Sequence, residues 1–460
     1  MNVVFRKIKS PEKDHAVPVM LTDETMEERR EKILSGMKKE GIDQLIVYND
    51  VEHAYNFMYL TGYFTRFEEG LLILSADGNA RLLLGNESLG KASKARIEAQ
   101  GILVSEFSLP NQPDFSGQPI EESFEKAGIV KEGKIGLAGW KLFTSKHDEN
   151  ETAFDLPSFI VEGIRKITDA KLVNATAIFI GKDGARTTNN ANEIAHYEYG
   201  ASLASDAMLD AMDHLDVGIK ESKLGDLLVR EGQHTSVVTI AAAGERFIKA
   251  NMFPTDRRVK PGDTISLTNG YFGGSSSRAG YAVHDESGLP ENSKDYLDKV
   301  VKPYFKAYVT WLETIRNGMK GSELYETIEG VLPKEKYGWK LNPGHLVAEE
   351  EWLCSPIRQD SKEILKSGMI FQIDIIPSVK GYGGVSAEST IVLADETLKK
   401  ELEKDYPDVY ARMCRRRDYI TKELGIDLSE DVLPMCSTVA YLRPYLLNKE
   451  YAMAKEQAKT

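Results

Sequence analysis

Apolar and polar residues follow two different periods in the first part of the chain, and together they predict an α/β domain. A helix is expected from Thr22 to Gly41, because a capping residue precedes a mostly charged run and a glycine ends it. A short apolar strand follows over 42–50. Apolar runs on both sides of Asp77-Gly78 predict a hairpin, since this dipeptide favours a tight turn. Helical and strand patterns then alternate to about residue 185, which indicates a mixed sheet covered by helices.

The second half of the chain begins with long helical patterns. A helix is expected over 192–216, where apolar side chains recur with helical spacing and should face the core. Further helices are expected over 221–230, 295–317 and 322–330, and a polar helix over 398–424. The apolar residues that follow, from Val432 to Leu446, predict that the tail packs across the domain or against a partner; Tyr441 or Arg443 closing an active-site mouth is the alternative.

Three chemically capable side chains stand between the helix expected over 322–330 and the polar helix expected over 398–424. His345 comes after a glycine, Asp374 stands in an apolar segment over 369–376, and Glu388 stands in a second apolar segment. Both segments are typical of strands, so we expect the three side chains to converge on one sheet. A carboxylate inside such a strand is costly unless something pairs with it. Any one of them alone is better explained as an edge charge facing water, but the three together favour a shared site.

The order of these residues resembles the creatinase/prolidase/aminopeptidase P family, which includes methionine aminopeptidase. Asp374 follows Ser367-Gly368-Met369, as in that family, and FPTDRRVKPGDTISLTNG at 253–270 looks like the lead-in to its first metal-ligand strand. The resemblance implies an α/β (α+β) fold, with an N-terminal creatinase-like α/β domain followed by a pita-bread catalytic-type domain. The implied boundaries are an extended arm over 1–20, the N-terminal domain over 21–185, the pita-bread domain over 186–395 and a C-terminal helical extension over 396–460.

The chain departs from this family at the positions that the resemblance assigns to metal. Peptidase members hold two metal ions with Asp, Asp, His, Glu and Glu in that order, whereas this chain has Thr268 at the first place and, by count, Arg278 at about the second. Two neighbouring divalent ions need bridging carboxylates to offset their repulsion. We therefore expect no stoichiometric metal and no cofactor. A single metal on His345, Asp374 and Glu388 stays open as a three-ligand site.

The composition and net charge exclude some classes of binding partner. The formal net charge of −13 argues against nucleic acid, because no long basic stripe offsets it. The three cysteines show no metal-binding spacing, and their scarcity favours a reducing cytoplasm. Charges interrupt the N-terminal segment and no membrane-length apolar run occurs, so neither a signal peptide nor a membrane partner is expected.

The leading hypothesis is a metal-independent, creatinase-like hydrolase that acts on a C–N bond of a small nitrogen-containing substrate. His345 would act as the general acid and base, while Asp374 and Glu388 orient its imidazole or hold a cationic substrate group. The candidate substrate-binding residues are Arg278, Asn251, Thr268, Trp352 and Arg66; Asn251 and Trp352 stand near the places of the family's substrate-side histidines. Arg278 would bind a substrate carboxylate bidentately.

Two other functions stay open. One is an Xaa-Pro aminopeptidase- or prolidase-type metallopeptidase that acts on a short peptide, and the other is a non-catalytic binding protein on the same fold. The resemblance also implies a homodimer, and the aromatic-basic loop from Tyr63 to Phe67, which includes Arg66, is the expected contact with the partner.

Overall fold

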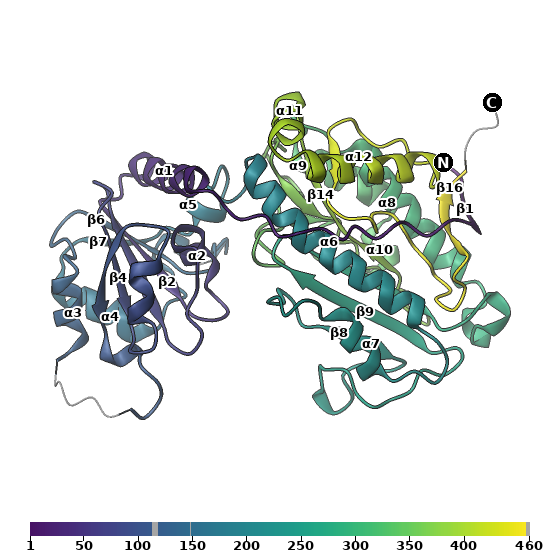
Figure 1. Cartoon of the computed structure of the whole chain (residues 1–460), viewed down its shortest axis with the longest axis horizontal. Helices are drawn as coiled ribbons and strands as arrows, with labels where there is room; N and C mark the ends of the chain where they lie inside the picture. Colours follow the sequence, from purple (N-terminus) through teal and green to yellow (C-terminus); the bar gives the residue numbers. More distant parts are fainter. Residues whose placement is uncertain (113–117, 148, 457–460) are drawn as a thin grey trace. The chain divides into compact units, whose positions relative to one another are not determined.

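The computed structural model describes residues 1–112, 118–147 and 149–456, which form two compact units (Figure 1). Residues 21–187 form the first unit, and residues 1–20 together with those from 188 onward form the second. The N-terminal arm and the C-terminal extension, which the sequence separates from the catalytic-type domain, therefore both belong to the second unit.

The first unit contains a mixed six-stranded sheet in the order β5-β4-β3-β2-β6-β7. Strand β3 pairs antiparallel with its two neighbours, and the other pairs are parallel. The strands are β2 (Gln44–Asn49), β3 (Gly70–Ser75), β4 (Ala80–Leu84), β5 (Ala99–Leu103), β6 (Lys134–Ala138) and β7 (Lys171–Asn174). The α-helices are α1 (Asp23–Glu40), α2 (Tyr55–Thr61), α3 (Ile120–Lys126), α4 (Ser158–Ile167) and α5 (Ala177–Ile180). This arrangement confirms the predicted α/β class.

Helix α1 begins and ends where the sequence predicts. The Thr22 hydroxyl accepts a hydrogen bond from the Thr25 backbone N–H at 3.2 Å, which satisfies one of the free donors of the first turn. Gly41 ends the helix with a φ of 63°, a left-handed conformation that favours glycine. The Asp77-Gly78 turn likewise joins β3 to β4 as an antiparallel hairpin.

The second unit contains two four-stranded antiparallel sheets and a two-stranded one. Their orders are β13-β10-β9-β8, β11-β12-β14-β15 and β1-β16. The strands are β1 (Val3–Lys7), β8 (Ile240–Ala243), β9 (Thr264–Tyr271), β10 (Gly274–Tyr281), β11 (His345–Leu346), β12 (Ile370–Gln372), β13 (Ser386–Glu388), β14 (Thr390–Leu393), β15 (Val432–Pro434) and β16 (Tyr451–Lys455). The α-helices are α6 (Ala191–His214), α7 (Glu221–Leu228), α8 (Lys302–Thr314), α9 (Gly321–Val331), α10 (Lys334–Tyr337), α11 (Glu396–Asp405) and α12 (Pro407–Lys422).

Helix α6 lies along strands β9 and β10 and holds their turn in place (Figure 1). Asn190 and Glu193 form a capping box at its N-terminus. Gly200 faces the β9–β10 turn so closely that a Cβ atom there would lie 1.9 Å from the Phe272 carbonyl oxygen. The helix therefore fixes the hairpin that carries two of the site positions described below.

The tail differs from its predicted form. One helix was expected over 398–424, but the structure has α11 and α12, because Pro407 cannot continue the hydrogen bonding of the first helix and begins the second. The rest of the tail packs within the second unit. The Tyr441 and Arg443 side chains are buried, and Arg443 forms an ion pair with Asp213 at 2.8 Å.

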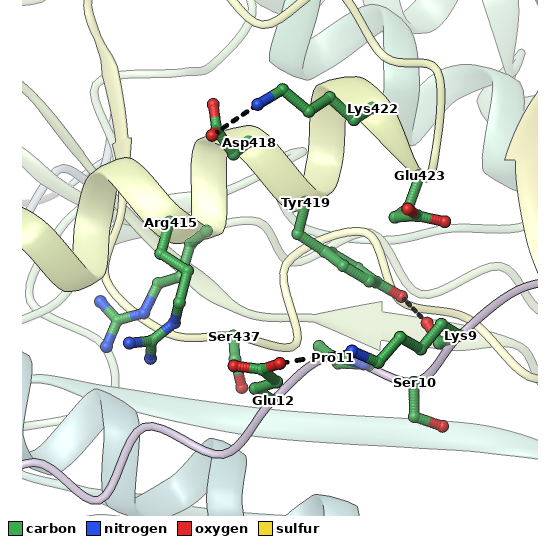
Figure 2. Close-up of a pocket in the computed structure, with 11 residues that line it drawn as sticks. Lys9, Ser10, Pro11, Glu12, Arg415, Asp418, Tyr419, Lys422, Glu423 and Ser437 are labelled. Atoms are coloured by element: carbon green, nitrogen blue, oxygen red, sulfur yellow. Dashed lines mark hydrogen bonds and ion pairs between the residues drawn. The ribbon is translucent and has the colours of Figure 1, made fainter.

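The N-terminal arm is held by the tail. Strand β1 pairs with β16, and farther along the arm the Asp14 carboxylate accepts hydrogen bonds from Arg415 and Arg416. A hollow of about 230 Å³ lies between the arm and α12, and Figure 2 shows the residues that line it. The Tyr419 hydroxyl donates to the Lys9 carbonyl across this hollow at 2.7 Å. Polar contacts between residues some 400 positions apart in the sequence therefore hold the arm in the second unit.

In the parts of the chain that the structure describes, none of the helices has the length and apolar character needed to cross a membrane.

Candidate active site

Three elements of the second unit bring His345, Asp374 and Glu388 together. His345 opens β11, Asp374 lies two residues beyond the end of β12, and Glu388 is the last residue of β13. One ligand atom from each lies within 4.8 Å of the others, and His345 Nε2 is 3.8 Å from Asp374 Oδ2. His345 and Glu388 are buried, and Asp374 is partly buried. A cluster of two carboxyls and one imidazole therefore exists, as the sequence predicts.

The cluster does not lie on one sheet, so that part of the prediction is wrong. The apolar segment that contains Glu388 forms two strands, and the chain passes from one sheet to the other at Ser389. Asp374 lies outside β12, because only residues 370–372 of the predicted strand 369–376 pair with neighbours. The site therefore lies at the junction of two sheets, where strands end and side chains of both can meet.

Strand pairing identifies the residues that face Glu388. In the β13-β10-β9 register Glu388 stands opposite Ser277, and Ser277 stands opposite Thr268. Side chains of directly paired residues project from the same face of a sheet. The Thr268 hydroxyl donates to the Ser277 hydroxyl at 3.1 Å, which is consistent with this placement. Two uncharged hydroxyls, those of Thr268 and Ser277, therefore lie on the same sheet face as Glu388.

Arg278 does not enter this site, contrary to the prediction. It is adjacent to Ser277 on β10, and alternation along a strand turns its side chain to the opposite face. There its guanidinium is 1% exposed and donates to the carbonyls of Ser277, Glu388, Thr438 and Tyr441 and to the Ser389 hydroxyl. Burial lowers its pKa. Arg278 therefore ties the tail to the end of β13 and is unable to bind a substrate carboxylate.

The pKa values of the site carboxyls are raised in the absence of a cation. Burial, and then repulsion from Glu388 and Glu351, raise the pKa of Asp374 well above its ordinary value. Burial also raises the pKa of Glu388, although hydrogen bonds from Ser275 and Gln372 oppose this change. Burial, followed by repulsion from Glu388, raises the pKa of Glu351 to about 7. The charge of Arg278, on the opposite face, also opposes the change at Glu388, but burial outweighs it.

His345 presents one ring nitrogen to these acids. Its Nδ1 lies 3.1 Å from the Leu346 carbonyl oxygen, so the Nδ1–H tautomer donates there and leaves Nε2 as an acceptor. The Trp352 ring stacks on the imidazole with centroids 4.2 Å apart and an interplanar angle of 25°. Burial lowers the pKa of His345 to about 4, so the imidazole is neutral at physiological pH.

The other predicted substrate-binding residues lie in two different places. Asn251 is exposed on the loop after β8, where its side chain forms hydrogen bonds with the Phe253 backbone. Arg66 is exposed in the first unit, and its predicted contact with a partner subunit stays a prediction. Ser277 and Glu351 were missed by sequence reasoning. The register of the β9–β10 hairpin identifies Ser277, whereas Glu351 is hidden in a run of three glutamates.

The site fits one divalent cation but not two. One ligand atom of each of the three side chains lies within 4.8 Å of the others, close enough for three donors to one cation, and the Asp374 Oδ1 atom has no hydrogen-bond partner among the described residues. A second cation would have to be held by Thr268 and Ser277, whose hydroxyls carry no charge and bond each other. Without bridging carboxylates at these places, repulsion between two cations is not offset.

This charge balance predicts an unusual pH dependence of stability. Asp374 and Glu351 have raised pKa values, so without a cation the folded protein keeps protons that the unfolded chain releases. The contribution of Glu351 to stability therefore falls as the pH rises from about 4.5 to about 7, and that of Asp374 falls as the pH rises through its own raised pKa, the reverse of salt-bridged acids. A bound divalent cation competes with these protons, and stabilisation by manganese should grow with pH. Thermal unfolding from about pH 5 to about pH 8, with manganese or with EDTA, measures both effects.

The variant Glu351→Gln is the control for this pH dependence. The variant removes one carboxyl with a raised pKa and lowers the repulsion on Asp374. The fall in stability with rising pH, measured in EDTA, should therefore become shallower. If stability fell with pH as steeply as in the parent, the pH dependence could not be assigned to this site.

Comparisons with known proteins agree with this architecture. The model of Metallopeptidase family M24 matches residues 195–395, and that of the Creatinase/Prolidase N-terminal domain matches residues 29–137. An Xaa-Pro dipeptidase of Pyrococcus furiosus is 22% identical over 386 residues, which cover 82% of this chain and 97% of that protein. One of Lactobacillus helveticus is 22% identical over 244 residues and covers 50% of this chain; the match spans 63% of that relative, less than two thirds of it.

Solved structures confirm the predicted fold. The recombinant prolidase from Thermococcus sibiricus superposes with a TM-score of 0.62 at 19% identity, over 81% of this chain and 95% of that chain. The arrangement of a creatinase-type N-terminal domain followed by a pita-bread domain is therefore that of the structure described above.

Proposed function

This chain belongs to the creatinase/prolidase/aminopeptidase P family of hydrolases, and from this premise we propose that it hydrolyses a C–N bond of a short peptide with one divalent cation at His345, Asp374 and Glu388. Two relatives named Xaa-Pro dipeptidase support a peptide bond before proline as the first substrate to test. This proposal replaces the metal-independent reaction as the leading hypothesis.

The observation that carries the proposal is a buried donor set whose negative charge is only partly compensated. Two carboxyls and a neutral imidazole lie within 4.8 Å, the carboxyl pKa values are raised, and no cationic side chain of the described residues forms an ion pair with either carboxyl. Such an arrangement costs free energy when the carboxyls ionise, and a divalent cation offsets this cost. Arg278, the cation that could have played this role, is committed to main-chain carbonyls on the other face.

The residues of this chain would divide the chemistry as follows. His345 Nε2, Asp374 and Glu388 would hold the cation, which when bound polarises a carbonyl and activates water. Ser275 and Gln372 hold the Glu388 carboxyl, with the Ser275 hydroxyl 2.9 Å from Oε1. Glu351, a carboxyl whose pKa burial raises, would take a proton from water and return it to a leaving amine.

The metal-independent hydrolase is the second candidate, and the Thr268–Ser277 pair favours it because this pair replaces charged ligands by neutral hydroxyls. In that reaction a neutral His345 would accept a proton and a protonated Asp374 would donate one. Elemental analysis separates the two candidates. We expect about one manganese, cobalt or zinc equivalent per chain after loading and removal of excess metal. Hydrolysis of Ala-Pro that survives complete metal removal would support the metal-independent reaction instead.

The double variant Thr268→Asp/Ser277→Asp tests why the site holds one cation and not two. It restores carboxylates at the two paired positions opposite Glu388, so the bound metal should rise from about one to about two equivalents per chain. Without metal the variant should be less stable than the parent, because two more acids join an already acidic cluster. The matched control is Thr268→Asn/Ser277→Asn, which has nearly the same shape without the charge. An unchanged stoichiometry in the aspartate variant would show that the hydroxyl pair does not set the cation number.

A further inference from the structure

Arg278 is a buried cation whose hydrogen-bond acceptors are all uncharged. It is 1% exposed, and no carboxylate among the described residues forms an ion pair with it. Its five N–H donors are matched by five oxygen acceptors, which belong to its neighbour Ser277, to the end of β13 and to the C-terminal extension. Burying a guanidinium without a carboxylate is costly. The contacts of Arg278 therefore join segments of the chain instead of pairing charges.

Two of these acceptors belong to a buried turn of the C-terminal extension. The Tyr441 N–H donates to the Thr438 carbonyl at 3.0 Å, and Ala440 between them has a φ of 62°, a conformation that non-glycine residues seldom adopt. Arg278 donates to the Thr438 carbonyl at 2.6 Å and to the Tyr441 carbonyl at 3.0 Å. All three residues of the turn are 0% exposed. The turn therefore attaches the guanidinium to two carbonyls in fixed positions.

The turn is itself held by segments that are distant in the sequence. The Ser437 N–H donates to the Asp14 carboxylate of the N-terminal arm at 3.0 Å, and the Thr438 N–H donates to the Ser205 hydroxyl of α6 at 3.2 Å. The arm and the extension both lie outside the residues that match the family models. A frame particular to this chain therefore stands behind the sheet that carries the site.

On the side of the sheet, the contacts of Arg278 lead to the backbone of the donor Glu388. Its Nη1 atom donates to the Glu388 carbonyl at 2.8 Å. Its Nη2 atom donates to the Ser389 hydroxyl at 3.1 Å, and this hydroxyl donates to the same carbonyl at 2.7 Å. Glu388 ends a strand of only three residues, and the chain passes to the next sheet at Ser389. Because so short a strand has few pairing partners, the contacts from Arg278 add constraints where the donor needs them.

We propose that Arg278 is a positioning residue for the cation donor Glu388, and that the turn over 438–441 is the frame against which it holds this donor. This inference rests on the proposed function and gives the C-terminal extension a part in it. Arg278 lies on the opposite sheet face and fixes the Glu388 backbone, while Ser275 and Gln372 hold the carboxyl. A donor that is fixed at both ends loses little freedom when a cation binds, which favours binding.

The direction of the effect separates positioning from charge. The Arg278 charge attracts the Glu388 carboxylate and therefore competes with a bound cation. If the guanidinium acted through its charge alone, its removal would tighten cation binding. If it positions Glu388, its removal should weaken cation binding although a competing charge is lost.

The test is the Kd of manganese, measured by calorimetry on the full chain of the parent, Arg278→Met, Arg278→Lys and the control Arg443→Met. Arg443 is another buried arginine of the extension, and it donates to the Met212 and Leu446 carbonyls. We expect Arg278→Met to raise the Kd by about 10- to 100-fold, as is typical when a residue that orients a metal ligand is lost. Arg278→Lys should raise it less, because an ammonium has three donors instead of five. Arg443→Met should keep the parent Kd.

Ser389→Ala tests the same link without removing a charge. It deletes the hydroxyl that accepts from Arg278 and donates to the Glu388 carbonyl. We expect a severalfold rise in the Kd of manganese, smaller than that of Arg278→Met. If Arg278→Met does not fold, Ser389→Ala and Arg278→Lys decide the positioning role in the same way.

The remaining outcomes distinguish this inference from the proposed function. If the parent binds manganese but the Kd is unchanged or lower in the Arg278 and Ser389 variants, or rises equally in Arg443→Met, the positioning role is wrong while the proposed function stands. If the parent binds no manganese, the proposed function fails, and hydrogen exchange of the backbone amides over 386–390 in the metal-free protein decides the positioning role alone. Faster exchange in Arg278→Met than in Arg443→Met would support this role, and equal exchange in the two variants would overturn it.

Discussion

Replacing Glu388 by Gln is expected to abolish cation binding and to lower hydrolysis of Ala-Pro by about 1,000-fold, because several kcal/mol of transition-state stabilisation are lost with the cation. The amide keeps the shape of the carboxyl and can still bond the Ser275 hydroxyl, which lies 2.9 Å from Oε1. It removes the negative charge that a cation requires. Because the buried carboxyl has a raised pKa, its neutral replacement should not destabilise the metal-free protein. Metal content, kcat and the unfolding temperature in EDTA together measure these effects.

Glu349→Gln is the matched control for this prediction. Glu349 is another buried glutamate of the same unit, and its carboxyl accepts a hydrogen bond from the Tyr197 hydroxyl at 2.7 Å. It is not one of the three donors, so the variant should still bind about one cation. If Glu388→Gln kept both the cation and the activity, the donor set would be wrong. If neither the parent nor any variant hydrolysed a peptide but the cation still bound, the non-catalytic binding protein would be the better interpretation.

The sequence predicts the members of the site better than its geometry. His345, Asp374 and Glu388 can be found because each stands in a recognisable local pattern: a glycine turn or an apolar strand. Counting along the sequence predicts Arg278 at the place of the family's second metal ligand. The strand pairing instead places Ser277 opposite both Thr268 and Glu388. A shift of one residue in a strand exchanges its two faces. The register depends on the turn between β9 and β10 and on the packing of Gly200 against that turn, which no local pattern encodes.

The fold of the first unit could be predicted in more detail than that of the second. Helix α1 and the β3–β4 hairpin are set by neighbouring residues, namely a cap, a terminal glycine and an Asp-Gly turn. In the second unit, the arm and the tail are held by contacts between residues some 400 positions apart, such as Asp14 with Arg416. The Arg415-Arg416-Arg417 run has the composition of a solvated helix face, yet Arg416 is 2% exposed. Only tertiary structure shows that Asp14 and Glu198 meet it.

Replacing Arg416 by Met is expected to destabilise the second unit by about 3 kcal/mol, since the removal of one partner leaves buried charges without full compensation. The guanidinium forms ion pairs with Asp14 and Glu198, whose side chains are both 0% exposed. It also donates to the Ser202 hydroxyl at 2.8 Å and to the Pro434 carbonyl at 3.1 Å. Methionine fills much of the volume but satisfies none of these acceptors. Urea unfolding followed by tryptophan fluorescence measures the loss, because Trp311, Trp339 and Trp352 lie in this unit.

The pH dependence of this destabilisation separates charge from packing. Burial alone would raise the pKa of Glu198, but Arg416 and Arg412 hold it below its ordinary value. The stability that Glu198 contributes is therefore present above its unfolded pKa of about 4.5 and is lost as the pH falls through the lower folded value. The difference in stability between the parent and Arg416→Met should be large at neutral pH and should shrink under acid conditions.

Arg415→Met is the neighbouring control. The Arg415 side chain is 44% exposed, so the loss of its ion pair with Asp14 should cost less than about 1 kcal/mol. A loss for Arg416→Met that is as small as this, or that does not change with pH, would show that the buried ion pairs do not hold the arm and the tail together.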